Sequence, residues 1–251
     1  AGIDLPEFTR SSQHTTLGKY AGEYNAVVET LSYSESETLE SMVRAIAEGM
    51  VERVLSELTR LRQITSRAKV PATREFVVNA LEQEESLVVF SWERETATQI
   101  FNGLGSYTKF LAHGGVSQKE RNAAIDAFQL SKEPAVMVTT YGAMAEGVTL
   151  HRARICVLHD LEWTLSAMLQ AEKRVHRLGQ TRNCQAIWML AEKSIDTLIA
   201  PILLRKAELM AEILGIHHDV QSDLGLSALA GRDDADALIS RAFAAWDGAV
   251  Q

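Results

Sequence analysis

Cysteine is scarce in this chain, which has only Cys156 and Cys184 among its 251 residues. Two cysteines cannot build the disulfide framework of a small secreted domain, and no Cys/His spacing matches a zinc site. Each cysteine lies inside an apolar run. We therefore expect two buried thiols in a reducing compartment and no bound metal.

Long apolar runs are also missing. No stretch approaches the roughly 20 residues that span a bilayer, and residues 1–10 hold acids and a proline rather than an apolar targeting core. The sequence therefore predicts a protein that neither crosses a membrane nor carries a secretory signal. Hydrophobic residues make up 46% of the chain, which is enough for a substantial core.

Net positive charge is lacking too, since the formal net charge is −8. This balance argues against a protein that coats nucleic acid by bulk electrostatics, but it permits a local basic path. Two groups of basic residues are candidates for such a path. The first group is equally consistent with a solvated surface that binds nothing. The first consists of Arg60, Arg62, Arg67, Lys69 and Arg74, and the second of Lys173, Arg174, His176, Arg177 and Arg182.

Two motifs of nucleotide hydrolases do not occur. The chain has no Gly-x-x-x-x-Gly-Lys-Ser/Thr phosphate loop, and no Asp-Glu pair follows a strand as a magnesium-binding motif would. Phosphoryl transfer needs a cradle for the phosphates, a metal ion and a positioned water. We therefore expect this chain by itself to hydrolyse ATP negligibly.

Short buried strands alternate with amphipathic helices from residue 87 onward, which predicts a parallel sheet covered on both faces. In such sheets, ligands lie at the carboxyl ends of the strands. That edge would carry Ser91-Trp92, Thr139 to Thr149 and His159 to Trp163. A proline at position 71 favours the start of a separate helix there. Ser117 with Glu120 three residues on matches a capping box at the start of a helix. Residues 5–14 are expected to be extended. The expected strands are 87–90, 107–112, 135–139, 155–159 and 186–191, and the expected helices are 18–31, 37–64, 71–83, 94–104, 117–128, 195–214 and 235–246.

One further segment, Gln170 to Gln180, carries the most information. If it is helical as far as Leu178, then Gln170, Arg174 and Arg177 share one face. Two guanidiniums one turn apart, on a helix anchored from its other side, suit the clamping of a phosphate. The alternative is a helix with solvated arginines. The inward-facing apolar stripe would be Met168, Ala171, Val175 and Leu178.

Four segments in this order resemble the second RecA-like lobe of superfamily 2 helicases. The ending Arg-Val-His-Arg-Leu-Gly-Gln is typical of the Swi/Snf-type branch, and Lys69 to Ala72 with Ala200 to Leu203 resemble its annealing-helicase subgroup. The resemblance covers about residues 5–215. It implies a RecA-like α/β fold in 68–215, preceded by an extended and helical region in 1–67 and followed by a tail in 216–251 with a short amphipathic helix. The four segments are Leu87 to Phe90, His113 to Arg121, Thr139 to Leu150 and Gln170 to Gln180.

The resemblance implies catalytic roles for Arg177, as an arginine finger that reaches the γ-phosphate of ATP, and for Arg174, as the second arginine of the motif. It implies that Gln170 couples nucleotide to DNA. Gly147 and Thr149 would lie in a loop that faces both ATP and DNA.

The resemblance also implies DNA contacts. Gly114, Gly115, Thr140 and Tyr141 match positions near the DNA backbone, where a missing Cβ lets a phosphate approach backbone N–H groups. Trp163 matches an aromatic residue of the family, and core packing is an equal alternative for it. The chain departs from the family pattern at 142–146 and at Thr164-Leu165, so its DNA contacts there are expected to differ in detail from those of the family.

The function implied is the second motor lobe of an ATP-dependent double-stranded DNA translocase. ATP with Mg²⁺ would be bound mainly by a first RecA-like lobe, in cis or in trans, so we expect a fragment or one half of a split enzyme. A scaffold module derived from such a lobe is the alternative, and another arginine-bearing phosphate-binding α/β fold is a weaker one. The lean sequence favours a bacterial or viral source and a cytoplasmic location, with the nucleus left open.

Overall fold

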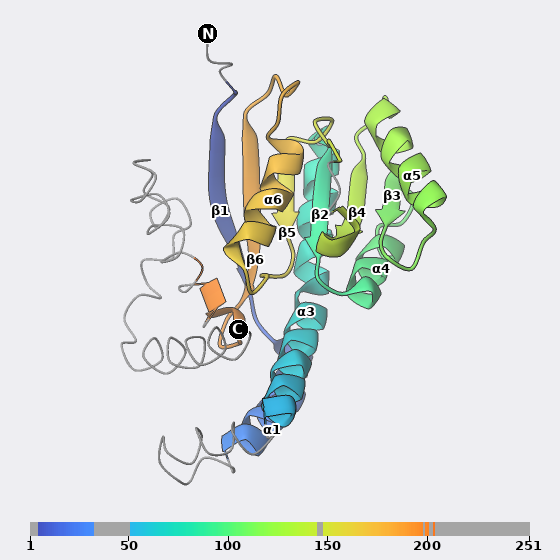
Figure 1. Ribbon diagram of the computed structural model, residues 1–251. Helices are drawn as coiled ribbons and strands as arrows, with labels where there is room; N and C mark the ends of the chain where they lie inside the picture. The colour runs from blue at the N-terminus through green and yellow to red at the C-terminus, as the bar shows by residue number, and fades with distance from the viewer. Residues whose placement is uncertain (1–4, 33–50, 145–147, 198, 201–202, 204–251) are drawn as a thin grey trace, which may run out of the picture.

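The computed structural model describes residues 5–32, 51–144, 148–197, 199–200 and 203, and its sheet has six strands (Figure 1). The strand order is β1-β6-β5-β2-β4-β3, and every neighbouring pair is parallel. The predicted parallel α/β fold is confirmed. The strands are β1 (Phe8–Thr15), β2 (Leu87–Ser91), β3 (Lys109–Ala112), β4 (Val136–Thr140), β5 (Ile155–Leu158) and β6 (Cys184–Ala191).

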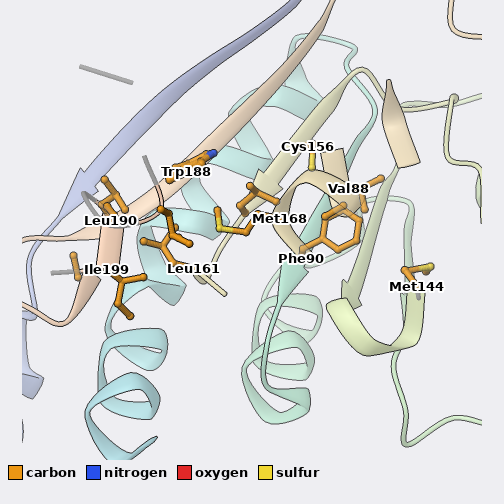
Figure 2. Close-up of a cluster of buried hydrophobic side chains, with 14 of the residues drawn as sticks. Val88, Phe90, Met144, Cys156, Leu161, Met168, Trp188, Leu190 and Ile199 are labelled. Carbon is orange, nitrogen blue, oxygen red and sulfur yellow. The ribbon is translucent and has the colours of Figure 1, made fainter. Parts of the chain in front are cut away.

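Helices cover both faces of this sheet (Figure 1). One face packs against α5 and α6, and the other against α4 and the C-terminal part of α3. The alternation along β2 shows the two faces, because Val88 and Phe90 join one core cluster while Leu87 and Val89 join the other. Figure 2 shows Phe90 of β2 near Met168 of α6 within the first cluster. The helices are α1 (Ala21–Ser32), α3 (Val51–Glu82), α4 (Arg94–Asn102), α5 (Gln118–Leu130) and α6 (Leu165–Val175), with short 3-10 turns η1 (Gly18–Tyr20) and η2 (Tyr141–Met144).

Helix α3 runs without a break through Pro71, so the prediction of two helices, 37–64 and 71–83, was wrong. Proline removes one backbone hydrogen bond and normally ends or bends a helix. Here Val70 on one side of the proline and Val77 on the other are both buried against the sheet, while Pro71 itself is exposed. Tertiary packing therefore holds the helix together across it. The expected boundary between residues 67 and 68 falls inside α3.

The start of α5 follows the predicted capping box. Ser117 Oγ accepts a hydrogen bond from the Glu120 N–H, and the Glu120 carboxylate accepts one from the Ser117 N–H at 3.0 Å. This reciprocal pair satisfies two amides that the first turn would otherwise leave without partners. It also fixes the loop that joins β3 to α5.

Both cysteines are free and buried, as predicted. In the part of the chain that the structure describes, no helix is long and apolar enough to cross a membrane. No cluster of His, Cys, Asp and Glu side chains among these residues could hold a metal ion. Most of the expected helix 195–214 and all of the tail 216–251 lie outside the described residues.

Candidate functional site

The arginine-bearing helix is shorter than expected. Helix α6 ends at Val175, not at Leu178, and His176 leaves the helical conformation with φ −88° and ψ 83°. The His176 ring explains the ending, because its Nε2 donates to the carbonyl oxygen of Pro6 at 2.7 Å. Gly179 then turns the chain with φ +99°. Arg177 therefore lies in a turn after the helix.

The apolar stripe of α6 is confirmed in part. Met168, Ala171 and Val175 are buried under the sheet, as predicted. Leu178 is 59% exposed, so its placement in the stripe was wrong. The reason is the early end of the helix, since a residue beyond Val175 no longer follows the 3.6-residue period.

Three of the candidate residues, Arg174, Arg177 and Thr149, lie together at the C-terminal end of α6. The guanidinium of Arg177 donates to Thr149 Oγ1 at 3.2 Å, and the N–H of Leu150 donates to the carbonyl oxygen of Arg174 at 2.7 Å. These two bonds join the loop that follows η2 to the end of α6. Gly147, the remaining candidate for the nucleotide, lies outside the described residues.

The two arginines are placed where an anion could reach them. Arg177 is exposed and Arg174 is half-buried. Burial lowers the pKa of Arg174 from its usual value, and the nearby charge of Arg177 lowers it further. Because each cation raises the electrostatic free energy of the other, an anion bound between them would relieve that repulsion.

A cavity of about 280 Å³ opens beside these residues. Gln170 and Arg174 of α6 line one part of it, and Tyr141 of η2 lines another. Residues expected to contact nucleotide and a residue expected to contact DNA therefore share one cavity. Glu162 also lines it, and burial raises the pKa of that carboxyl group, while the charge of Arg62 opposes the rise.

The candidate DNA residues lie at one edge of the sheet. Because the strands are parallel, the loops that follow β3, β4 and β5 meet at their carboxyl ends. Gly114 and Gly115 in the first loop are exposed. The N–H of Gly115 donates to Nδ1 of His113 at 3.0 Å, and a Cβ on Gly115 would lie 2.9 Å from the same ring. The glycine thus makes room for His113.

Thr140 and Tyr141 face inward at this edge. Thr140 is buried, and the hydroxyl of Tyr141 donates to the carbonyl oxygen of Asp160 at 2.6 Å. The Tyr141 ring stacks on Phe90 with a centroid separation of 5.6 Å. These side chains therefore support the carboxyl edge of the sheet from its buried side.

Trp163 takes part in a sandwich that the sequence did not reveal. The guanidinium of Arg62 lies 5.0 Å from the Trp163 ring and 4.5 Å from the Trp92 ring, and it donates to the carbonyl oxygen of Leu161 at 2.8 Å. Such cation–π contacts stabilise two aromatic rings at one site. Trp163 also packs against the main core cluster. Arg62 thereby connects α3 to the segments that follow β2 and β5.

The first basic group is structural rather than a continuous basic path. Arg62 lies in the sandwich, Arg67 pairs with Glu23 at 3.0 Å, and Arg74 donates to the carbonyl oxygen of Gln99. Lys69 is only 1% exposed. Arg60 is exposed.

A buried polar network ties α3 to the edge of the sheet. Lys69 Nζ lies 2.9 Å from Asp196 Oδ2 and 3.5 Å from Asp160 Oδ1. Burial opposes the charge of Asp160, but the Lys69 ammonium and hydrogen bonds from Ser91 and Ser66 outweigh it and lower the pKa of the carboxyl group. Spacing could have revealed Lys69, since Thr65, Lys69, Thr73 and Val77 recur every four residues and are all buried.

His159 belongs to the same network and is neutral. Its Nε2 donates to the carbonyl oxygen of Ser66 at 3.1 Å, so its Nδ1 accepts from the hydroxyl of Thr73 at 2.7 Å. Burial lowers the pKa of His159 from 6.5 to about 4.

This lowered pKa predicts a loss of stability in mild acid. Between pH 6.5 and about 4 the unfolded chain binds a proton at His159 that the folded chain does not, so the free energy of unfolding should fall as the pH drops through this window. The loss should be about 3 kcal/mol. Chemical denaturation at several pH values measures it, with His159→Gln as the control that does not titrate. Equal pH slopes in both proteins would contradict the assignment.

Comparisons with known proteins agree with this geometry. Residues 68–179 match the family model described as the helicase conserved C-terminal domain. The chain is 28% identical over 153 residues to the SWI/SNF-related matrix-associated actin-dependent regulator of chromatin subfamily A-like protein 1 of Xenopus tropicalis, covering 59% of this chain and 16% of that protein. It is 26% identical over 193 residues to the DNA annealing helicase and endonuclease ZRANB3 of Homo sapiens, covering 75% of this chain and 18% of that protein. The matched regions span about a sixth of the length of these relatives.

The fold also resembles a solved structure. The Sulfolobus solfataricus SWI2/SNF2 ATPase core in complex with dsDNA has a TM-score of 0.63 and 23% identity, covering 84% of this chain and 47% of that chain. Residues 68–179 therefore resemble a helicase conserved C-terminal domain, the relatives with similar sequences are a SWI/SNF-related protein and an annealing helicase, and the chain shares its RecA-like α/β fold with the Sulfolobus structure.

Proposed function

We propose that the chain acts as the second motor lobe of an ATP-dependent double-stranded DNA translocase. One observation carries the proposal: Arg174 and Gln170 line a cavity together with Tyr141, while Arg177 bonds to Thr149 at the same end of α6. Two residues that we propose for the nucleotide and one that we propose for DNA thus line one cavity. A first lobe with a phosphate loop, in cis or in trans, would complete the ATP site.

The arginines suit the phosphate end of ATP. Both guanidiniums are planar, carry a permanent charge and present several donors, which matches the oxygens of a triphosphate. Arg177 would stabilise the negative charge that develops on the γ-phosphate during transfer. Mg²⁺ would be held mainly by the first lobe, since the described part of this chain has no carboxylate cluster for it.

The carboxyl edge of the sheet suits the DNA backbone. The exposed loop at Gly114 and Gly115 offers a surface without side chains, which a phosphate could approach. The Sulfolobus structure with a similar fold contains double-stranded DNA. Trp163, held by Arg62, lies at the same edge and would pack beside the strand or support the loops that contact it.

The cavity offers a route by which ATP binding could be coupled to DNA binding. Gln170 and Tyr141 both line it. Closure of the first lobe on ATP would move α6 and thereby change the surroundings of Tyr141. Opening after hydrolysis would reverse the change, and alternation of the two states would step the lobes along DNA.

The test is DNA-stimulated ATP turnover by this chain paired with a first lobe, either in one polypeptide or mixed as two. We expect turnover only when both lobes and duplex DNA are present. The chain alone serves as the blank. ATP turnover is also measured for the Glu162→Ala variant, which removes a carboxylate from the lining of the cavity. A correctly folded pair that binds neither DNA nor ATP would refute the motor function. Co-purification of a partner without a phosphate loop would support the scaffold alternative.

A further inference from the structure

The first described strand, β1, lies beside the arginine-bearing helix although about 160 residues separate them in sequence. It pairs in parallel with β6, with Phe8 opposite Cys184 and Arg10 opposite Ala186 (Figure 1). Residues i and i+2 of a strand point to the same face. Phe8 and Arg10 therefore share a face, and both contact α6 or the residue that ends it.

Arg10 makes a two-bond ion pair with Glu172. Its Nε donates to Glu172 Oε1 at 3.0 Å and its Nη2 donates to Oε2 at 2.6 Å. The side chains are 16% and 4% exposed. Paired bonds of this kind fix both distance and angle, and their partial burial protects them from screening by salt.

A second contact lies one helical turn further along. His176 donates to the carbonyl oxygen of Pro6 at 2.7 Å, and its ring centroid lies 5.0 Å from that of Phe8. The guanidinium of Arg10 lies 4.9 Å from the same Phe8 ring. The two contacts are therefore joined to each other through Phe8.

These contacts lie next to the candidate catalytic arginines in the sequence. Glu172 precedes Arg174 by two residues, and His176 directly precedes Arg177. The apolar stripe of α6 determines which side of the helix faces the sheet, but apolar contacts are not directional. The position of the helix along its own axis needs bonds of fixed geometry, and the β1 contacts supply them.

We infer that Phe8, Arg10, Glu172 and His176 form a β1 clamp whose role is to position Arg174 and Arg177 for the γ-phosphate. The clamp rests on the proposed function, because its positioning role presupposes that the two arginines act on a phosphate. Its members are positioning residues and do not touch ATP. A displacement of about 1 Å in such a group can lower a rate by about 100-fold.

The test uses the double variant Arg10→Met/Glu172→Met in the full chain. Replacing both members of a buried ion pair with apolar residues of similar size is often neutral for stability, so the fold should survive while the directional bonds are lost. Arg10→Lys is a second variant, which keeps the charge but cannot form the two-bond geometry. The matched control is Arg67→Gln, which breaks the 3.0 Å ion pair between α3 and Glu23 of α1.

The first measurement is amide hydrogen exchange of residues 170–180 in the chain alone. We expect exchange to speed up by about tenfold in the double variant, less in Arg10→Lys, and not at all in Arg67→Gln, because local opening rises when tertiary bonds are removed. Unchanged exchange in the double variant would overturn the clamp, whatever the chain does with ATP.

The second measurement is ATP turnover by the two-lobe protein. We expect kcat to fall by about 10- to 100-fold in the double variant, while the KM for ATP changes by less than about threefold, since the first lobe would supply most ground-state binding. Faster exchange with an unchanged kcat would overturn the positioning role. If the unaltered two-lobe protein has no turnover, the proposed function fails, and the exchange experiment still decides whether β1 holds α6 in place.

Discussion

Substitution of Arg177 by alanine should lower the kcat of the two-lobe ATPase by about 10³- to 10⁵-fold. The substitution removes the exposed guanidinium that lies beside Thr149 at the end of α6. Arg174 does not have the same placement, because it is half-buried and lines the cavity instead. Steady-state turnover with saturating duplex DNA measures the effect, and the unfolding midpoint of the variant should stay unchanged.

Arg182→Ala is the matched control for this experiment. Arg182 is 44% exposed and bonds to Glu85 and to the carbonyl oxygen of Arg152, so its guanidinium is held by partners other than Thr149. We expect its loss to leave kcat within about threefold, as for most surface substitutions. An Arg177→Ala enzyme as fast as the Arg182→Ala enzyme would remove Arg177 from catalysis.

Replacement of Lys69 by methionine should cause the largest loss of stability, about 3 to 5 kcal/mol. Methionine fills the space of the lysine stem but leaves Asp160 and Asp196 buried without the cation that lies between them. Burial already raises the pKa of Asp196, and the Lys69 charge opposes that rise. Without Lys69 the carboxyl group should take up a proton more readily, so the loss should shrink as the pH falls. Equilibrium denaturation in urea at neutral and at acid pH measures both effects.

Arg67→Met provides the comparison within the same helix. The Arg67–Glu23 pair is partly exposed, with side-chain exposures of 32% and 40%, and such pairs contribute about 0 to 1 kcal/mol. Equal losses for Lys69→Met and Arg67→Met would show that the buried network contributes little to the stability of the fold.

Local signals predicted much of this structure. The apolar run at Leu87 to Phe90 gave a buried strand, and Ser117 with Glu120 gave the start of α5, because both patterns depend only on neighbouring residues. The spacing of Gln170 and Arg174 also placed these two side chains together at the cavity. Whether the candidate residues bind ATP and DNA stays a prediction.

Features that depend on contacts between residues far apart in the sequence could not be predicted from it. The end of α6 at Val175 is set by a bond from His176 to Pro6, which no local pattern reveals. The passage of α3 through Pro71 depends on burial against strands that come later in the chain. The basic group near Lys69 was consistent with a surface path because the sequence does not show that Asp160 and Asp196, from the segments that follow β5 and β6, lie beside Lys69.

The pairing of β1 with β6 has a consequence for biosynthesis. The two strands are neighbours at one side of the sheet (Figure 1), but they are far apart in the sequence, because β1 begins at Phe8 and β6 ends at Ala191. At typical translation rates, β1 would wait about 10 to 40 s for its partner to leave the ribosome. During that delay its backbone donors and acceptors are open to other strands, which is a recognised route to aggregation. The nascent chain should therefore benefit from a chaperone until β6 has emerged.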